Sequence, residues 1–127
     1  VPFMTIVLRK GYGLGAHAMA AGSFHAPLLT VSSPTGEFGG MGLEGAVKLG
    51  FRKELEAVDD PQERRELYEK TVALAYEVGK AVNMASHFEL DDVIDPADSR
   101  QRVVSALRSV PDPPPRVGKK RPCIDTW

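Results

Sequence analysis

The 127-residue sequence has one cysteine, Cys123, and one tryptophan, and its charges nearly cancel, giving a net charge of -1 at pH 7. A single cysteine excludes an intrachain disulfide and a multi-cysteine metal site. A net charge so close to zero gives no electrostatic reason to expect a nucleic acid or an anionic membrane as the partner. A chain of this length can still bury enough surface to fold without crosslinks.

The sequence also lacks a long apolar run. No stretch reaches the ~18 consecutive apolar residues of a membrane span. The segment Val1–Leu8 has neither the basic leader nor the cleavage site of a signal peptide. We therefore expect a cytoplasmic protein. Because the chain opens on Val-Pro-Phe, inside an expected strand and without an initiator methionine, we also expect it to be a piece of a longer protein.

What the sequence does contain is one pattern that occurs twice: a strand, a glycine turn and a helix. The β-branched run Val1–Leu8 predicts a strand buried on both faces, and a helix is predicted over Leu14–Gly22, after glycines at 11, 13 and 15. A second strand is predicted over His25–Val31, and glycines at 39, 40 and 42 precede a helix over 43–49. The repetition favours a layered α/β spiral, with a helical bundle containing short strands as the alternative.

A long helix is predicted from Asp60 onward. Asp60, Pro61 and Glu63 supply the cap acceptor, the proline and the acidic residue that are typical of a helix start. Apolar residues continue at helical spacing as far as Ala85, so this helix should have a wide apolar face. We expect that face to pack on a core or on a partner.

The end of the chain has fewer secondary-structure signals. Asp95 and Pro96 repeat the start signal for a last short helix, and the acidic residues from Glu89 to Asp98 are interpreted as caps and a solvated turn. The histidines and their acidic neighbours have no metal-ligand spacing, so no metal is expected. From Pro111 to Trp127 the composition turns to proline and basic residues, which predicts a tail.

The glycine turn has three interpretations. It could hold a phosphate, although it lacks the glycine spacing of a dinucleotide site and the Lys-Ser/Thr pair of a P-loop. It could be a tight turn that lets a strand and a helix pack closely. It could also form an oxyanion hole, in which backbone amides of Leu14, Gly15 or Ala16 meet a developing negative charge. Ser23, which lies between two histidines, has no nucleophile-elbow motif around it, so we interpret it as structural.

Four blocks, in order along the chain, resemble one known family. They are RKGYGLGAHAMAAGSFHAP, PTGEFGGMGLEGAVKLGFRKELE, DDVIDPADSR and KKRPCIDTW. Together they are similar to the C-terminal region of the carboxyltransferase (β) subunit of biotin-dependent acyl-CoA carboxylases, of the acetyl-CoA and propionyl-CoA type. The resemblance covers nearly the whole chain.

The resemblance implies a crotonase-like fold, a spiral of stacked β-β-α turns. It implies that residues 1–110 are part of the C-terminal carboxyltransferase domain and that residues 111–127 are a tail. In that family an N-terminal domain holds the acyl-CoA, and the C-terminal domain of another protomer faces it and receives carboxybiotin. The expected partners are therefore that N-terminal domain, a biotin carboxylase and biotin carrier subunit, and further copies of the chain.

The resemblance also implies a site. The catalytic groups would be the backbone amides of Leu14 and Gly15, acting as an oxyanion hole for biotin. His17 falls where the family adjusts its acyl-chain pocket. The remaining residues expected at the biotin and substrate site are Gly13, Ala16, Thr35, Gly39, Gly40 and Gly42.

The implied reaction transfers the carboxyl group of carboxybiotin to the α-carbon of acetyl-CoA or propionyl-CoA. An alternative is a non-catalytic assembly subunit, because Ser33 stands where relatives commonly have tryptophan and the acyl-CoA half is absent. A hydratase-like enzyme of the same fold ranks last, since it needs a pair of acid-base carboxylates that the sequence does not clearly provide.

Overall fold

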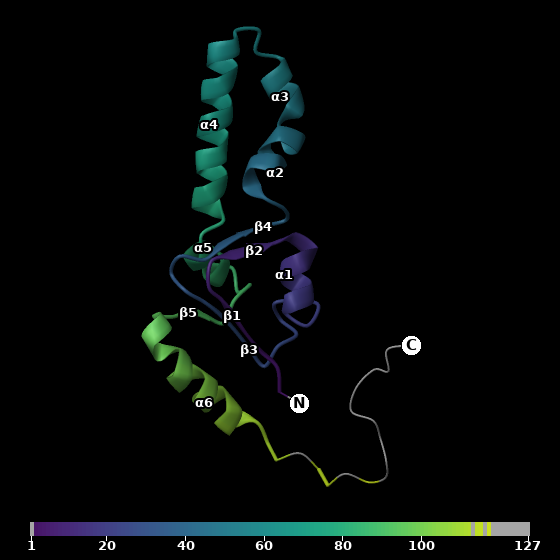
Figure 1. The fold of residues 1–127 in the computed structure, drawn as a ribbon, viewed down its shortest axis with the longest axis vertical. Coiled ribbons are helices and arrows are strands. Elements are labelled where there is room, and N and C mark those ends of the chain that lie inside the picture. Colours follow the sequence, from purple (N-terminus) through teal and green to yellow (C-terminus); the bar gives the residue numbers. More distant parts are fainter. Residues whose placement is uncertain (1, 113, 116, 118–127) are drawn as a thin grey trace.

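The computed structural model describes residues 2–112, 114–115 and 117, so most of the predicted tail, with Cys123, lies outside the described residues. The described chain forms five strands, six α-helices and one short 3-10 helix (Figure 1). None of these helices is long and apolar enough to cross a membrane. The prediction of an α/β architecture is confirmed, and the alternative of a helical bundle is wrong.

The strands form two small parallel sheets. One has the order β1-β3-β5 and the other pairs β2 with β4. In the first, Met4 lies opposite Leu29, and in the second Gly11 lies opposite Phe38. The bounds are β1 Met4–Val7, β2 Lys10–Tyr12, β3 Leu29–Ser32, β4 Glu37–Gly39 and β5 Asp92–Val93.

Two predictions about the strands need correction. The first strand is not buried on both faces, because only Val7 of β1 is buried and its other residues are half-buried. The second strand does not begin at His25. The amides of His25 and Ala26 donate to the Ser23 hydroxyl and carbonyl, which holds this segment in turns before β3 starts.

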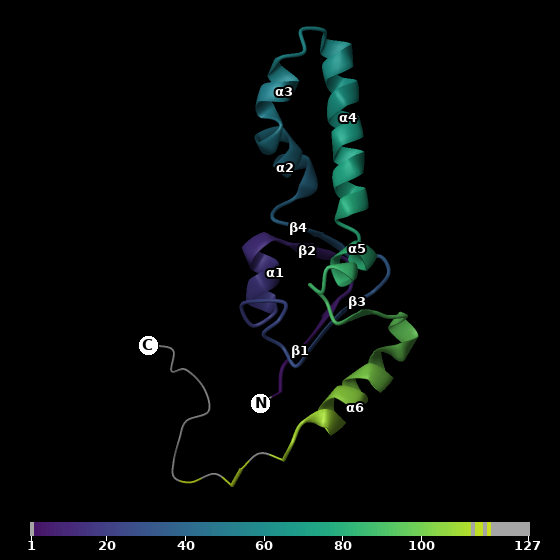
Figure 2. The same ribbon diagram turned by 180° about the vertical axis from the view of Figure 1, so that it is seen from behind.

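The helices fall into three groups. α1 (Gly13–Met19) follows β2. α2 (Leu43–Gly50) and α3 (Arg52–Glu56) run against α4 (Pro61–Val78), and together they form a helical hairpin that projects from the sheets (Figures 1 and 2). α5 (Ala81–Ser86) returns to the sheets, and α6 (Ser99–Ser109), preceded by the 3-10 turn Pro96–Asp98, lies at the opposite end of the molecule from the hairpin.

The long helix begins where the sequence predicts but ends earlier. The Asp60 carboxylate accepts the Glu63 amide at 3.1 Å, which confirms the N-cap. The prediction of one helix as far as Ala85 is wrong, because the chain turns at Gly79. There the Gly79 carbonyl accepts the Phe38 amide at 2.8 Å, and the amide of Ala81 donates to Gly36 at 3.0 Å. These two bonds draw the chain onto β4 and end α4.

The core lies between the sheets, α1 and α5. Its buried residues are Val7, Ala20, Phe24, Phe38, Ala81 and Leu90. α4 contributes none of its residues to the core. Part of its apolar face packs on α2 and α3, while Leu74 and Val78 are each 62% exposed. Burial in the described part of the chain is therefore concentrated at the sheets and the helices next to them, and not along α4.

Candidate functional site

The two strand-glycine-helix units lie side by side. Because β2 and β4 pair in parallel, the segments that follow them leave the sheet at the same edge. Gly13 has φ +60°, and a Cβ placed on it would come within 2.9 Å of the Gly40 carbonyl oxygen. A glycine is therefore required at position 13 by both its backbone angle and this close approach.

A pocket of about 430 Å³ lies between these turns. Five of the residues predicted at the site line it: Gly13, Leu14, His17, Gly39 and Gly40. The structure thus brings together residues from both glycine blocks, as an oxyanion-hole interpretation requires. We call this cavity the glycine pocket.

The other predicted residues lie elsewhere. Gly15 and Ala16 line a separate cavity of about 590 Å³ on another side of α1. Gly42 is the N-cap residue of α2 and is not among the residues that line the glycine pocket. Thr35 lies at the corner between β3 and β4, where its hydroxyl donates to the Leu8 carbonyl at 3.2 Å.

The amides predicted to act are in the first turn of α1. The first amides of a helix have no acceptor within the helix, and in α1 they include those of Leu14 and Gly15. The N-cap residue is Tyr12, whose side chain does not cap the helix. A short polar side chain at that position would accept a bond from the second or third amide. Tyr12 therefore leaves both amides uncapped by its own side chain.

Aromatic rings support the floor of the pocket. The His17 ring packs edge-on against Phe24, with 5.1 Å between centroids, and Phe24 packs the same way on Phe38 at 5.5 Å. Phe38 is only 2% exposed. His17, at the exposed end of this stack, is thus attached to the core through two rings.

Sequence reasoning did not assign five of the lining residues to the site: Gly11, Phe24 and Phe38, which lie close to the glycine blocks in sequence, and Met84 and Glu89, which lie far from them. Met84 lies in α5, which the sequence assigned to the long helix. The Glu89 carboxylate lies 3.4 Å from His25 Nε2, so this contact joins the turn after α5 to the segment after α1. No local sequence signal connects Met84 and Glu89 with Gly13, since they lie over sixty positions further along the chain.

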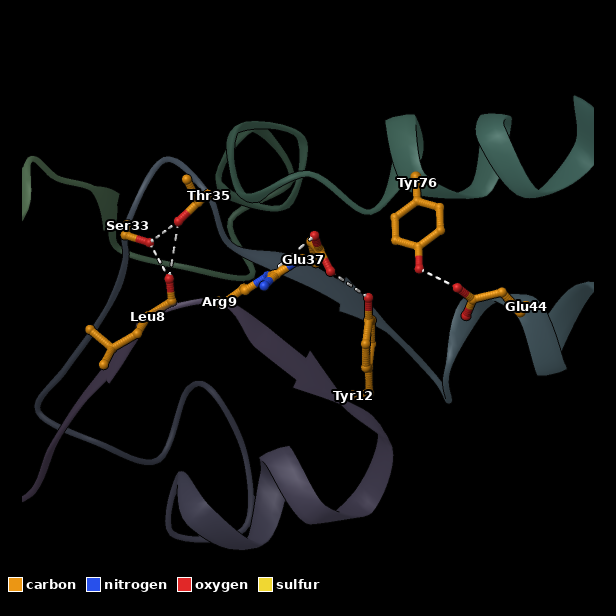
Figure 3. Close-up of polar contacts among 8 residues, drawn as sticks. All are labelled: Leu8, Arg9, Tyr12, Ser33, Thr35, Glu37, Glu44 and Tyr76. Atoms are coloured by element: carbon orange, nitrogen blue, oxygen red, sulfur yellow. Dashed lines mark hydrogen bonds and ion pairs between the residues drawn. The ribbon is translucent and has the colours of Figure 1, made fainter. Parts of the chain in front are cut away.

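Two tyrosine-glutamate hydrogen bonds lie near the glycine turns (Figure 3). The Tyr12 hydroxyl donates to Glu37 Oε2 at 3.0 Å, and Arg9 Nε lies 3.9 Å from the other carboxylate oxygen. Burial, and then the bond to Glu37, raise the pKa of Tyr12 far above its usual range. In the hairpin, the Tyr76 hydroxyl donates to Glu44 Oε1 at 2.5 Å, which raises the pKa of Tyr76 and lowers that of Glu44.

Ser33, which stands where relatives commonly have tryptophan, makes hydrogen bonds that support the fold. Its hydroxyl donates to the Leu8 carbonyl and lies 2.9 Å from the Thr35 hydroxyl (Figure 3). These bonds fasten the corner after β1 to the corner after β3. Ser33 is 6% exposed and is not among the residues that line the glycine pocket.

Comparison with known proteins identifies the family. A model described as "Carboxyl transferase domain" matches residues 1–120. The chain is 40% identical over 109 residues to the propionyl-CoA carboxylase carboxyltransferase subunit of Haloferax mediterranei. It is also 40% identical over 111 residues to the methylmalonyl-CoA carboxyltransferase 12S subunit of Propionibacterium freudenreichii subsp. shermanii. The alignments cover 85% and 84% of this chain but only 20% of either relative.

Solved structures give the same result. A single-chain, multi-domain long-chain acyl-CoA carboxylase is 57% identical, with a TM-score of 0.67 over 84% of this chain and 10% of that one. A transcarboxylase 12S structure, described as a hexamer with methylmalonyl-CoA bound, is 32% identical, with a TM-score of 0.76 over 97% of this chain and 24% of the other. Since the family model spans residues 1–120 and the resemblance found in the sequence is confirmed, the chain belongs to the carboxyl transferase domain family.

Proposed function

We propose that this chain is the biotin-facing part of a carboxyltransferase in a biotin-dependent acyl-CoA carboxylase. The reaction transfers the carboxyl group of carboxybiotin to the α-carbon of an acyl-CoA. The observation that carries the proposal is the glycine pocket, where two turns far apart in sequence meet within a chain of this family.

The pocket suits an uncharged ring such as that of biotin. Glycine is required at two positions of its wall, since a Cβ on Gly13 or Gly39 would come within 2.9 Å of a carbonyl oxygen or 2.7 Å of a leucine methyl. The lining side chains are mostly apolar, and the titratable ones are His17 and Glu89. A carboxylate in the lining repels a doubly charged phosphate more strongly than the smaller charge that develops on a ureido oxygen, so the pocket favours the oxyanion interpretation over the phosphate one.

The chain would act through its backbone. When biotin gives up the carboxyl group, negative charge builds on its ureido oxygen. Amides of Leu14 and Gly15, fixed in the first turn of α1, would stabilise that charge without reorganising. Gly13, Gly39 and Gly40 would shape the biotin approach, with Ala16, Thr35 and Gly42 behind or beside it, and His17 would limit the acyl chain.

We also propose that the fold is one part of a crotonase-like spiral, with residues 1–110 in the C-terminal carboxyltransferase domain and residues 111–127 as a tail. The order β1, β2, α1 followed by β3, β4, α2 is a β-β-α unit that occurs twice. Each strand of the first unit pairs in parallel with its counterpart in the second, as successive turns of a spiral would.

The proposed partners would supply the parts of the enzyme that the relatives have and this chain does not span. It covers about a fifth of the two curated relatives named above. We propose that the acyl-CoA is held by an N-terminal domain from another protomer, that carboxybiotin arrives from a biotin carboxylase and carrier subunit, and that the assembly is a homo-oligomer. The hexamer described for the transcarboxylase supports the last point. The proposed substrates are acetyl-CoA and propionyl-CoA.

The test replaces Gly15 by valine in the full-length enzyme. Nothing lies within 4 Å of a Cβ at Gly15, so the variant should fold, but it places a branched side chain in the first turn of α1, whose amides the proposal uses. We expect the rate of malonyl-CoA or methylmalonyl-CoA formation to fall about a hundredfold. Gly45→Val is the matched control, because Gly45 is also the third residue of its helix and is equally open. Undiminished carboxylation by Gly15→Val would contradict the assignment.

The same enzyme preparation tests the alternative of an assembly subunit. A stable complex with a biotin carrier domain that carboxylates no acyl-CoA would support that alternative. The position of Ser33 argues against it, because the serine supports the fold and does not line the pocket. A hydratase would need two carboxylates in the pocket, and among the described lining residues Glu89 is the only one.

A further inference from the structure

We propose that Tyr12 and Glu37 are positioning residues, whose hydrogen bond holds the two glycine turns in register across the pocket. The proposal rests on the function above, because it concerns the same pocket. Its basis is geometric: the bond joins the end of β2, where that strand runs into its glycine turn, to the start of β4, the strand that leads into the other glycine turn (Figure 3).

The two residues lie at opposite ends of the paired strands, since Glu37 is opposite Lys10 and Tyr12 is opposite Gly39. Tyr12 is the last residue of β2 and is followed directly by Gly13. Glu37 is the first residue of β4, which ends at Gly39. In the ladder Tyr12 lies opposite Gly39, so its side chain reaches back along the neighbouring strand to the Glu37 carboxylate. The bond therefore spans the short ladder along its length.

The glycine turns need a side-chain contact of this kind to fix their positions. Glycine restricts its own backbone less than any other residue, so a turn built from glycines takes its position from what flanks it. The sheet of β2 and β4 has only three residue pairs, and neither Gly11 nor Gly39 has a side chain to contribute. A hydrogen bond to a carboxylate is stronger than one between neutral groups. The tyrosine-glutamate bond is thus a substantial part of what fixes Gly13 against Gly40.

The carboxylate is itself held on a second side. Arg9 Nε lies 3.9 Å from Glu37 Oε1, while Oε2 accepts the tyrosine hydroxyl at 3.0 Å. Glu37 is half-buried, and its amide also donates to the Arg9 carbonyl at 2.6 Å. The backbone bond and the arginine both restrict where the carboxylate can lie.

The hairpin provides a matched control. Tyr76 makes the same kind of bond, to Glu44, but its bond joins α4 to α2 and not β2 to β4 (Figure 3). Tyr12→Phe and Tyr76→Phe each remove one hydroxyl and one bond to a carboxylate. Glu37→Gln removes the charge and keeps an oxygen that can accept the Tyr12 hydroxyl.

The experiment measures carboxylation kinetics and amide hydrogen exchange on the full-length enzyme and these variants. For Tyr12→Phe we expect kcat to fall about tenfold, with an unchanged KM for acyl-CoA, and exchange at residues 13–15 and 39–40 to accelerate about tenfold. For Tyr76→Phe we expect kcat within about twofold of wild type and faster exchange only in the hairpin. Glu37→Gln should keep most of the activity.

Two results would overturn the proposal. One is exchange in the glycine turns that Tyr12→Phe leaves at the wild-type rate, and the other is a loss in Glu37→Gln as large as in Tyr12→Phe. Failure of the proposed function looks different. If the wild-type enzyme carboxylates no acyl-CoA, the function is wrong, and the exchange rates still decide whether Tyr12 holds the turns.

Discussion

The paired glycine turns and the helical hairpin differ in how many of their side chains are buried. Around the turns, side chains such as Phe38 and Ala81 are 2% and 0% exposed. In the hairpin, α2 buries only Leu43 and Val47, α3 and α4 have no buried residue, and ion pairs such as Arg65 with Glu69 at 2.8 Å are exposed. Exposed pairs contribute little free energy. The difference indicates that the sheets, α1 and α5, which surround the pocket, contribute most of the stability of the described chain.

The sharpest way to break this comparison is to truncate one large side chain in each region. Phe38→Ala should cost about 3–5 kcal/mol of unfolding free energy, because it empties a fully buried site at the centre of the core. Leu74→Ala, in the hairpin, should cost less than about 0.5 kcal/mol, because Leu74 is 62% exposed. Urea denaturation of both variants measures the two values. Equal costs would mean that the hairpin is as much a part of the core as the sheets.

The same contrast applies to the glycine at the junction between the two regions. A Cβ on Gly79 would lie 2.4 Å from the Phe38 carbonyl oxygen, which is backbone and cannot move aside cheaply. Gly79→Ala should therefore destabilise the chain by about 1–3 kcal/mol. Gly50→Ala, at the end of α2 with nothing nearby, should be neutral or stabilise by up to about 1 kcal/mol. Thermal unfolding distinguishes the two, and a neutral Gly79→Ala would remove the explanation given for the end of α4.

That junction also shows how far the sequence alone predicts the fold. The start of α2 at Leu43 and of α4 at Pro61 follow from local signals, a glycine turn and a proline after a capping aspartate. The end of α4 does not, because apolar spacing continues through it and the bonds that end it come from Phe38 and Gly36. Local periodicity contains no information about such distant partners.

In the candidate site, too, some features follow from local sequence and others depend on distant contacts. Glycines in both blocks are visible in the sequence as turns, but the approach of Gly13 to Gly40 depends on the pairing of β2 with β4. These strands have three residues each and contain glycine, so their composition hardly predicts a strand. Met84 and Glu89 reach the pocket only because α5 folds back after the break at Gly79. Five of the nine residues that the family resemblance proposed, Gly13, Leu14, His17, Gly39 and Gly40, line one pocket where β2 and β4 pair.

The smallest expected effect concerns alkaline pH, where the two tyrosines should differ. The pKa of Tyr12 is raised above its ordinary value of 10.0, so the folded state keeps a proton that the unfolded chain loses. The stabilisation from this group is complete below about pH 10 and declines as the pH rises toward the raised pKa of the folded state. Stability of the wild-type chain should therefore fall more steeply above about pH 10 than that of Tyr12→Phe.

Tyr76→Phe should reduce the loss of stability at alkaline pH by less than Tyr12→Phe does, although the pKa of Tyr76 is also raised. Its hydroxyl is bound to an exposed carboxylate in the hairpin, where solvent and salt screen the interaction. Denaturant unfolding of the wild type and both variants between pH 8 and pH 11, roughly the range that brackets an ordinary tyrosine, measures the slopes. If Tyr76→Phe flattened the curve as much as Tyr12→Phe, the hairpin bond would be as protected as the one beside the glycine turns, and the proposed contrast between the two regions would not hold for hydrogen bonds.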